Sequence, residues 1–404
     1  MELRHLAIPL RRGQGEDGKN FTVITTKAQR AQGEILSGVF ARSEVVARIY
    51  TENVPLIAMS SIMKKISFIL FIVFLSKFSF AQDPRKKQLD QMFVKAYRDG
   101  KFNGNVLVAD KGRIVYSASF GYADTGGKQK LGVSHRFHIG SIAKEFNAVA
   151  IMMLQEQGKL KVGDKLSKYL PGLPKWADSI SILNLLQYTS GVPNSNWKDI
   201  KGDASNLASL QKVKQLDFTP GTKYAYNNNN VFLQRQVVEK ISGMPFRDFV
   251  EEKMLKPLKM DHTIIDPTLT ESNLAQGYSN LKVVDDVTPP FSGWVCPTIG
   301  DFYQWAMAID RFRLIGPEST KVIAQSYAPE SQAGLGHAAV VDRKMISHVH
   351  DGTARSYQAL LVSAVPKGRT ILLMTNNQQG NLYPINDAIQ AILDGKEVDS
   401  IGKE

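Results

Sequence analysis

The distribution of strand-like and helical segments is the sequence feature that most limits how this chain can fold. Two apolar or β-branched runs, residues 105–109 and 114–119, flank Asp110-Lys111-Gly112, a natural hairpin turn. Strand-like runs return only near the other end of the chain, at residues 335–341, 358–364 and 370–375. A sheet completed by both terminal segments is therefore expected.

The middle of the chain has a different pattern. Apolar residues at helical spacing predict helices at residues 88–99, 141–157 and 384–393. Between residues 159 and 290, short helical pieces alternate with loops broken by proline. We expect an α/β protein of the α+β type, in which residues 82–158 and 291–404 form an α/β lobe and residues 159–290 form a mainly helical lobe. The cleft between the lobes is the default site.

Residues 63–81 have the pattern of a secretory signal peptide. Two lysines precede an uncharged run, Ile66–Ser76, and small residues occupy the third and first positions before Gln82. The run is shorter than the roughly 18–20 residues that span a bilayer. A buried or anchoring helix is the alternative. We expect cleavage, a bacterial protein that is periplasmic or secreted, and no stable membrane span after cleavage.

Residues 1–62 are polar and mixed, without a sustained helical or strand period. A signal peptide belongs at an N-terminus, so the simplest hypothesis is that translation begins at Met63. A genuine, disordered N-terminal extension is the alternative.

Charge and cysteine content exclude several classes of protein. The whole chain carries a net charge of +12, but residues 82–404 carry 39 basic and 32 acidic residues, a net of +7. Lysines often stand beside acids, as in Lys144-Glu145, which suggests a solvated face and argues against nucleic-acid binding. One cysteine, Cys296, excludes an internal disulfide framework and a multi-cysteine metal site.

The first group of residues with chemical potential is Ser141-Ile142-Ala143-Lys144. A serine hydroxyl becomes a good nucleophile only when a neighbour takes its proton. On a helix, a lysine three residues later lies on the same face, within reach of the hydroxyl. A capping serine beside a surface lysine is the alternative reading of this short pattern.

The second group is Tyr226 with Asn228, which follows a Pro-Gly turn. A tyrosine paired with a lysine can move protons between a nucleophile and a leaving group, and Asn228 could hold Lys144 and a substrate amide. Ordinary turn chemistry in a polar loop is the alternative.

The third group is His350-Asp351-Gly352-Thr353, placed just before the strand expected near residue 358. A glycine there allows a substrate backbone to approach, and the next N–H can point at an oxyanion. A structural role for His350 is the alternative. If the chain is extended, His348 shares a face with His350, as a metal pair would, but no third ligand is suggested.

The order and spacing of the three groups resemble the class C β-lactamase-like serine hydrolases. This family includes class C β-lactamases, penicillin-binding D,D-peptidases, D-aminopeptidases and esterases. S-x-x-K at Ser141 is followed by Y-x-N at Tyr226 and then by H-x-G at His350. Residues 136–144 look like the family's nucleophile box, and residues 185–193 look like its leucine-rich stretch, which contains Thr-Ser-Gly. The resemblance covers most of residues 82–404 and implies a β-lactamase/transpeptidase-like fold.

The resemblance also implies roles for individual residues. Ser141 would be the acylated nucleophile, Lys144 its partner and Tyr226 the general acid/base. Substrate binding and the oxyanion hole would fall to Asn228, His350, Gly352 and Thr353. The oxyanion hole would be formed by the backbone N–H groups of Thr353 and Ser141.

No cofactor and no metal are implied. The substrate would be a small molecule or a peptide, and cell-wall material is one candidate source.

The third motif departs from the family pattern. β-Lactamases and penicillin-binding proteins usually carry Lys-Thr-Gly there, and the lysine and threonine help to bind the substrate carboxylate. A neutral histidine donates one hydrogen bond and is mostly uncharged near pH 7. We therefore expect an exported serine hydrolase of peptide, amide or ester bonds with weak β-lactamase activity at most. A sensor or scaffold that binds penicillin or peptidoglycan without turnover is the alternative.

Overall fold

The computed structural model describes residues 13–14, 20–21, 83–196, 198–268, 270–278, 284, 292–378 and 380–398. The chain forms two units, residues 1–81 and 82–404, and each is considered by itself. In the first unit, β1 (Gly13–Gln14) pairs antiparallel with β2 (Asn20–Phe21). The predicted signal peptide and the rest of the predicted N-terminal extension lie outside the described residues.

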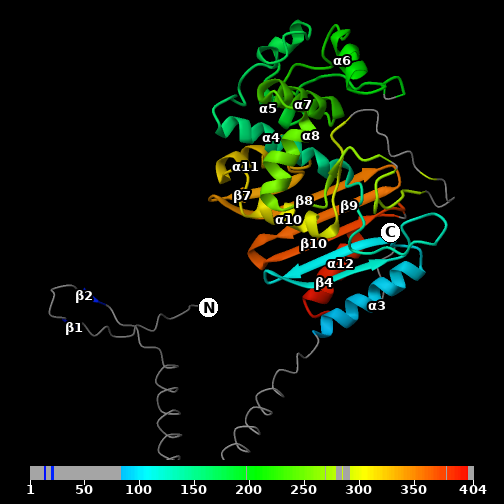
Figure 1. Cartoon of the computed structure of the whole chain (residues 1–404). Coiled ribbons are helices and arrows are strands. Elements are labelled where there is room, and N and C mark those ends of the chain that lie inside the picture. Colours follow the sequence, from blue (N-terminus) through cyan, green and yellow to red (C-terminus); the bar gives the residue numbers. More distant parts are fainter. Residues whose placement is uncertain are drawn as a thin grey trace, which may run out of the picture. The chain divides into compact units, whose positions relative to one another are not determined.

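The second unit is built on a six-stranded sheet. Its strands are β3 (Gly104–Asp110), β4 (Arg113–Phe120), β7 (His337–Val341), β8 (Lys344–Ala354), β9 (Tyr357–Ala364) and β10 (Arg369–Thr375). The order across the sheet is β4-β3-β10-β9-β8-β7, and every neighbouring pair is antiparallel (Figure 1). Because β3 pairs with β10, segments from both ends of this unit complete one sheet. The predicted α/β class of the α+β type is confirmed.

A chain of ion pairs fastens the two ends of this unit together. Asp110, at the end of β3, accepts hydrogen bonds from Arg85 at 2.8 Å and from Arg369 at 3.0 Å. Arg369 also bonds Asp394 at 2.8 Å. Arg369 and Asp110 are buried, so each charge depends on its partners for stability. The next residues, Lys111 and Gly112, have φ of 52° and 74°, which suits the predicted hairpin turn.

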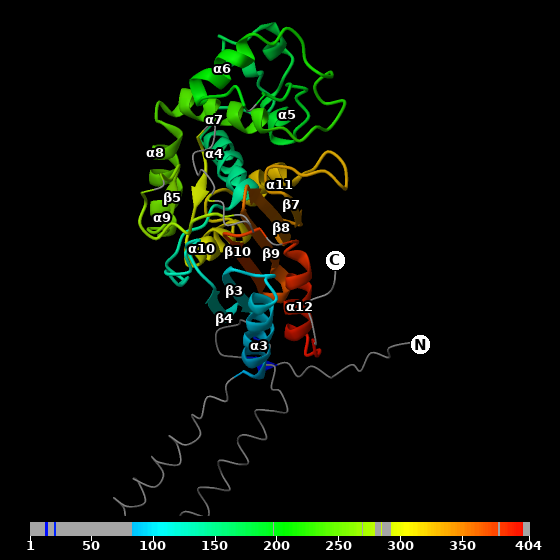
Figure 2. The same ribbon diagram turned by 90° about the vertical axis from the view of Figure 1, so that its right-hand side faces the viewer.

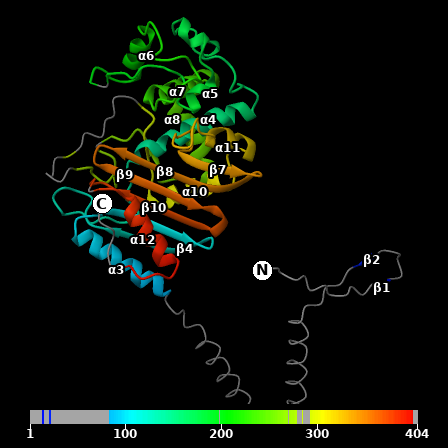
Figure 3. The same ribbon diagram turned by 180° about the vertical axis from the view of Figure 1, so that it is seen from behind.

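Two helices from opposite ends of the unit cover one face of the sheet. They are α3 (Pro84–Arg98) and α12 (Tyr383–Leu393), and they lie side by side (Figures 2 and 3). Phe93 of α3 is fully buried, with its ring centroid 5.0 Å from Phe102 and 5.3 Å from Phe120. Apolar residues of β3, β9 and β10 complete this core.

The opposite face of the sheet carries the core that extends to the site. It is covered by α4 (Lys144–Glu156), α10 (Ile299–Asp310) and α11 (Pro317–Ala324), as Figure 2 shows for α4 and α10. Nine of the 13 residues of α4 are buried, so this helix runs through the core rather than along the surface. Phe146 of α4 stacks on Trp305 of α10 with centroids 3.7 Å apart.

Apart from α10 and α11, the segment between α4 and the C-terminal strands consists mostly of further helical elements, most of them short (Figure 1). They are η2 (Leu166–Lys168), η3 (Lys175–Asp178), α5 (Ile182–Leu186), α6 (Asp203–Gln211), α7 (Asn228–Ser242), α8 (Phe246–Val250), η4 (Glu251–Leu255) and α9 (Lys256–Leu258). One strand of this segment was not predicted: β5 (Ile264–Ile265) pairs with β6 (Val295–Cys296). Cys296 is fully buried there, and burial raises the pKa of its thiol well above the usual value.

Two sequence predictions near the site are wrong. The α-helix predicted from residue 141 begins at Lys144, because residues 140–143 form the 3₁₀ turn η1 (Gly140–Ala143). The His350–Thr353 segment lies inside a strand, β8, rather than before one. The strand was missed because its core-facing positions include His348 and His350, so it lacks an apolar face. A short 3₁₀ helix, η5 (Val365–Lys367), connects β9 to β10.

The lobe boundaries at residues 158 and 291 stay a prediction, and residues 285–291 are outside the described ranges. Within the ranges that are described, no helix combines the length and the apolar character needed to cross a membrane.

Candidate active site

The site begins at the junction of η1 and α4. The Nζ atom of Lys144 donates a hydrogen bond to the Oγ atom of Ser141 at 2.9 Å. The 3₁₀ turn brings the two side chains together as the helical prediction expected, because positions i and i+3 share a face in both helix types. A weak local pattern thus forms a real contact between the hydroxyl and the side-chain nitrogen of the lysine.

Tyr226 reaches the same hydroxyl from a loop that is distant in the sequence. Its Oη atom lies 2.9 Å from the Oγ atom of Ser141 and donates to it. The Nζ atom of Lys144 lies 5.2 Å from the centroid of the Tyr226 ring. Tyr226 is 38% exposed, so the three side chains meet where solvent and substrate can enter. The structure brings the three predicted catalytic residues together, and their roles remain predictions.

Backbone contacts hold the loop that carries Tyr226. Ala225 N donates to Tyr188 O at 2.9 Å, which fastens this loop to the stretch that contains Thr-Ser-Gly. Gly191 in that stretch has φ of 72°, and a Cβ there would lie 2.2 Å from Phe218 O. Only glycine combines this φ with so close an approach of the two loops.

The next residue, Asn227, is the N-cap of α7. Its side chain accepts from Asn229 N at 2.8 Å and donates to Val192 O at 2.5 Å. The start of α7 is therefore tied to the same neighbouring loop, and the position of Tyr226 is fixed from both sides.

Tyr188 is a site residue that the motifs did not reveal. It is 2% exposed, and its ring centroid lies 4.8 Å from that of Tyr226. Its φ is 56°, a strained value for a residue other than glycine. Burial raises the pKa of the Tyr188 hydroxyl well above its usual value, and the neighbouring Tyr226 raises it further. Tyr188 therefore supports Tyr226 as a neutral aromatic surface.

Two glycines allow η1 and β8 to pack backbone against backbone. A Cβ on Gly352 would lie 2.0 Å from Ile139 O and 2.8 Å from Ser141 N. A Cβ on Gly140, whose φ is 53°, would lie 2.5 Å from Thr353 N. The N–H groups predicted for the oxyanion hole, on Ser141 and Thr353, therefore belong to two backbone segments in direct contact.

Asn228 is the first residue of α7, and its side chain lines a small cavity of about 20 Å³ next to Lys144. Buried Asn147 and Arg235 line the same cavity, whose volume suits about one water molecule. Asn228 and Lys144 are both described, and no hydrogen bond joins their side chains. The expected contact between the two side chains is not formed.

The carboxylate of Glu145 is the second site feature that the motifs missed. Its Oε1 atom lies 2.7 Å from His348 Nε2 and 2.7 Å from His350 Nδ1, and its Oε2 atom accepts from Trp305 Nε1 at 2.6 Å. Glu145 is 0% exposed, so the expectation of a solvated Lys144-Glu145 face is wrong for the carboxylate. The partners of Glu145 lie far away in the sequence, so no local motif contains them. The available signal was a charged residue on a largely apolar helix.

The histidine pair does face one side of β8, as an extended chain requires, but both rings bind this carboxylate. Among the residues described, no group of three or more His, Cys, Asp or Glu side chains is arranged to hold a metal ion.

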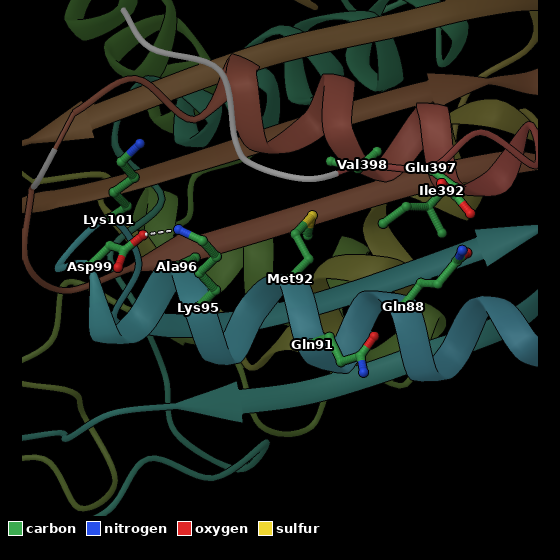
Figure 4. Close-up of a pocket in the computed structure, with 10 residues that line it drawn as sticks. All are labelled: Gln88, Gln91, Met92, Lys95, Ala96, Asp99, Lys101, Ile392, Glu397 and Val398. Carbon is green, nitrogen blue, oxygen red and sulfur yellow. Dashed lines mark hydrogen bonds and ion pairs between the residues drawn. The ribbon is translucent and has the colours of Figure 1, made fainter.

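A larger hollow of about 390 Å³ lies elsewhere, between α3 and the end of α12 (Figure 4). It is lined largely by polar side chains of α3 and of the residues that follow it, among them Lys95 and Asp99, which form an exposed ion pair at 2.7 Å. None of the predicted site residues contributes to it. Volume alone is therefore a poor guide to the reactive centre of this protein.

Comparison with known proteins gives a consistent family match. The family model described as Beta-lactamase matches residues 89–395. The chain is 32% identical over 188 residues to "Penicillin-binding protein 4*" of Bacillus subtilis (strain 168), covering 44% of this chain and 41% of the relative. It is 28% identical over 305 residues to "Putative penicillin-binding protein PbpX" of the same strain, covering 72% and 75%. A "Teichoic acid D-alanine hydrolase" of Staphylococcus aureus is 26% identical over 258 residues, covering 61% and 63%.

These matches span between about two fifths and three quarters of the relatives' own lengths.

Solved structures show the same fold. A penicillin binding protein from Bacillus halodurans superposes with a TM-score of 0.65 at 23% identity, over 74% of this chain and 98% of that one. A class C beta-lactamase superposes with a TM-score of 0.66 at 20% identity, over 80% and 99%.

Proposed function

The chain belongs to the beta-lactamase family, and we propose that it is an exported serine hydrolase that cleaves ester or amide bonds through an acyl-enzyme on Ser141. The observation that carries this proposal is the pair of contacts to one hydroxyl. Lys144 Nζ and Tyr226 Oη each lie 2.9 Å from Ser141 Oγ. A capping serine beside a surface lysine would not need a tyrosine from a distant part of the chain at the same oxygen.

In the first step, Ser141 Oγ attacks the substrate carbonyl carbon. Lys144 Nζ and Tyr226 Oη are the two groups within reach of the hydroxyl proton, so one of them must enter the reaction unprotonated. The carbonyl oxygen becomes an oxyanion next to the N–H groups of Ser141 and Thr353. The proton then passes to the leaving alcohol or amine, and the acyl group stays on Ser141.

In the second step, water attacks the acyl-enzyme. Tyr226 is the better placed of the two bases for a water molecule that enters from solvent, because its side chain is 38% exposed. It would take a proton from the water, and Ser141 Oγ would regain a proton as the acid product leaves.

The substrate is proposed to be an ester or amide of small-molecule or peptide character, with bacterial cell-wall material as its source. The names of the relatives support this choice, since two are called penicillin-binding proteins and one is called a teichoic acid D-alanine hydrolase. His350 stands where β-lactamases usually carry lysine, and its ring is 2% exposed. We propose weak hydrolysis of β-lactams at most.

Export is proposed from residues 63–81 alone. The basic start, the uncharged run and the small residues before Gln82 support cleavage there. Mass spectrometry of the protein recovered from the periplasm or the medium is the test. A mature N-terminus well upstream of Gln82 would contradict both the cleavage site and the proposed start at Met63.

Labelling with a fluorescent fluorophosphonate, followed over time, tests the acyl-enzyme. We expect wild-type protein and the surface variant Ser209→Ala to label, and Ser141→Ala to remain unlabelled while it keeps its circular dichroism spectrum. A fluorescent penicillin then separates an enzyme from a sensor. Label that persists for hours would favour the sensor, and labelling of Ser141→Ala would contradict the assignment.

A panel of nitrophenyl esters, D-amino-acid amides, D-Ala-D-Ala peptides and nitrocefin tests the bond that is cleaved. We expect turnover of at least one ester or amide class and a kcat/KM for nitrocefin far below it. Efficient turnover of nitrocefin would contradict the proposed substrate range.

A further inference from the structure

A single buried carboxylate organises the floor of the site. Glu145, on α4, receives N–H donors from β8 through His348 and His350, and from α10 through Trp305, all between 2.6 and 2.7 Å. Its side chain is 0% exposed, and those of the two histidines are 0% and 2% exposed. These contacts are shielded from bulk solvent, so the direction of each hydrogen bond is set by the chemistry of the partners.

Glu145 is ionised, and this decides the direction. Burial by itself would raise the pKa of its carboxyl, but the charge of His348 and the hydrogen bonds from both imidazoles outweigh burial and lower it. An ionised carboxylate only accepts hydrogen bonds. The ring nitrogens that contact it, His348 Nε2 and His350 Nδ1, must therefore each carry a proton.

The tautomer of His350 follows from that contact. A neutral imidazole has one N–H and one bare nitrogen, and the partner of one nitrogen determines the state of the other. With Nδ1–H donated to Glu145, the Nε2 atom of a neutral His350 carries a lone pair. Nε2 makes no hydrogen bond within the described residues and is not among the fully buried unpartnered atoms, so it retains contact with solvent.

His350 also lies beside the reactive centre. It is two residues before Gly352 on the same face of β8, and Gly352 packs on the backbone of Ser141. The other strand, β7, pairs with β8 only as far as Val349. In the described part of the chain, no strand follows β7 along β8 from His350 to Ala354, so a substrate can lie along this edge.

One further contact fixes the ring. A Cβ on Gly336 would lie 2.6 Å from Cγ and 2.8 Å from Cδ2 of His350. Glycine at position 336 thus leaves the space that the imidazole fills, and the ring is held between the Gly336 backbone and the Glu145 carboxylate. Rotation that would offer Nδ1 to the substrate would break the bond to Glu145 and collide with this backbone.

We propose that Glu145 holds neutral His350 with its Nε2 lone pair toward the substrate. The site then selects esters or amides that offer an N–H or O–H donor to this nitrogen, and it rejects those that offer a carboxylate. This proposal rests on the proposed function and adds a substrate class to it. It also corrects an expectation from the sequence: the one hydrogen bond that a neutral His350 donates goes to Glu145 and not to the substrate.

Nitrogen-15 NMR of histidine-labelled wild-type protein at pH 8 tests the tautomer without any substrate. The chain has seven histidines, and the His350 signals are assigned by their loss in His350→Gln. We expect a protonated Nδ1 and an unprotonated Nε2 at His350, and the opposite or mixed form in Glu145→Gln. A wild-type His350 protonated at Nε2, alone or together with Nδ1, would overturn the proposal.

Boronic acids test the selectivity, because they form a tetrahedral adduct with a nucleophilic serine whatever the natural substrate is. The matched probes are phenylboronic acids with a carboxamide or a carboxylate at the meta or para position, with unsubstituted phenylboronic acid as reference. We expect the better carboxamide isomer to bind wild type at least about tenfold more tightly than its carboxylate counterpart, as one hydrogen bond gained and one repulsion avoided require. The ratio should fall below about threefold in Glu145→Gln and reverse in His350→Lys.

The two arms separate the possible failures. If no boronate binds wild type, and Ser141→Ala behaves identically, the proposed function fails, while the NMR result still decides the tautomer. If boronates bind through Ser141 but wild type prefers the carboxylate, or Glu145→Gln keeps the wild-type ratio, the inference is overturned and the hydrolase stands.

Discussion

Replacing Gly352 with alanine tests the backbone contact on which the proposed oxyanion hole depends. The added methyl group would lie 2.0 Å from Ile139 O and 2.8 Å from Ser141 N, whereas ordinary contacts of a Cβ atom begin near 3.4 Å. Both neighbours are backbone atoms, so no side chain can rotate away. To accommodate the methyl group, η1 and β8 must move apart at this point by most of the difference between 2.0 Å and 3.4 Å.

That separation moves the two N–H donors relative to each other, because one belongs to Ser141 and the other to Thr353. A displacement of about 1 Å at a reacting group costs on the order of 10²-fold in rate, and loss of one oxyanion donor costs about 10²–10³-fold. We expect Gly352→Ala to lower kcat for a nitrophenyl ester by about 10²–10³-fold. Overpacking of a tight contact also costs about 1–3 kcal/mol of unfolding free energy, so the variant should still fold.

The assay is the rate of acyl-enzyme formation by stopped flow, with a urea denaturation curve for each protein. Gly163→Ala is the matched control, because a Cβ there meets no heavy atom within 4 Å. It should keep wild-type rates and stability. A folded Gly352→Ala that acylates within threefold of wild type would refute the claim that this contact sets the oxyanion geometry.

Three further predictions follow from single residues. Tyr226→Phe removes the hydroxyl 2.9 Å from Ser141 Oγ and should lower the acylation rate about 10²–10⁴-fold. The melting temperature should change little, since the side chain is 38% exposed. An unchanged rate would show that Tyr226 takes no part in the chemistry. Burial, and then the charge of Arg355, lowers the pKa of His138 to about 4 from 6.5, so the unfolded state binds more protons between these pH values and stability falls as the pH falls. Relative to His138→Gln, the wild type should lose about 3 kcal/mol of unfolding free energy between pH 7.5 and 4 in urea titrations. Parallel curves of stability against pH for the two proteins would contradict this. Asp203→Ala leaves the buried Arg235 cation without its carboxylate at 2.7 Å and should cost about 3 kcal/mol of unfolding free energy. Arg235→Met should cost less in the same denaturation assay, because it removes the buried charge as well. Equal costs would show that the ion pair itself supplies the stability.

The sequence predicted five of the six strands of this sheet, and the clearest of them are buried on both faces. All seven residues of β3 and of β10 are buried, and such strands appear as continuous apolar runs. β8 was missed for the complementary reason. From His348 onward its buried positions alternate with less buried ones, but the buried residues are His348, His350 and Gly352, so the alternation is present in burial and absent from hydrophobicity.

The reactive residues were predictable to different degrees. Ser141 and Lys144 are neighbours on one turn, so their contact follows from local geometry, whereas the arrival of Tyr226 required the family resemblance. Glu145 and Tyr188 escaped both approaches. A carboxylate next to a lysine normally marks solvent, and only the tertiary structure supplies the distant N–H donors that make its burial acceptable.

Those donors explain how one acidic residue can determine both the shape and the selectivity of the site. A buried carboxylate is strongly unfavourable unless its oxygens are hydrogen-bonded, and once its partners are present their N–H groups can point in only one direction. Glu145 follows Lys144 directly, while its partners His348 and His350 lie on the strand that carries Gly352 and Thr353. The same contacts thus join the element that bears the nucleophile's partner to the element that bears the oxyanion donor. An apolar residue at this position could fill the space, but it could not set the ring tautomer that the substrate meets. The choice between a carboxylate and a hydrogen-bond donor in the substrate is therefore made on α4, by a side chain that the substrate never touches.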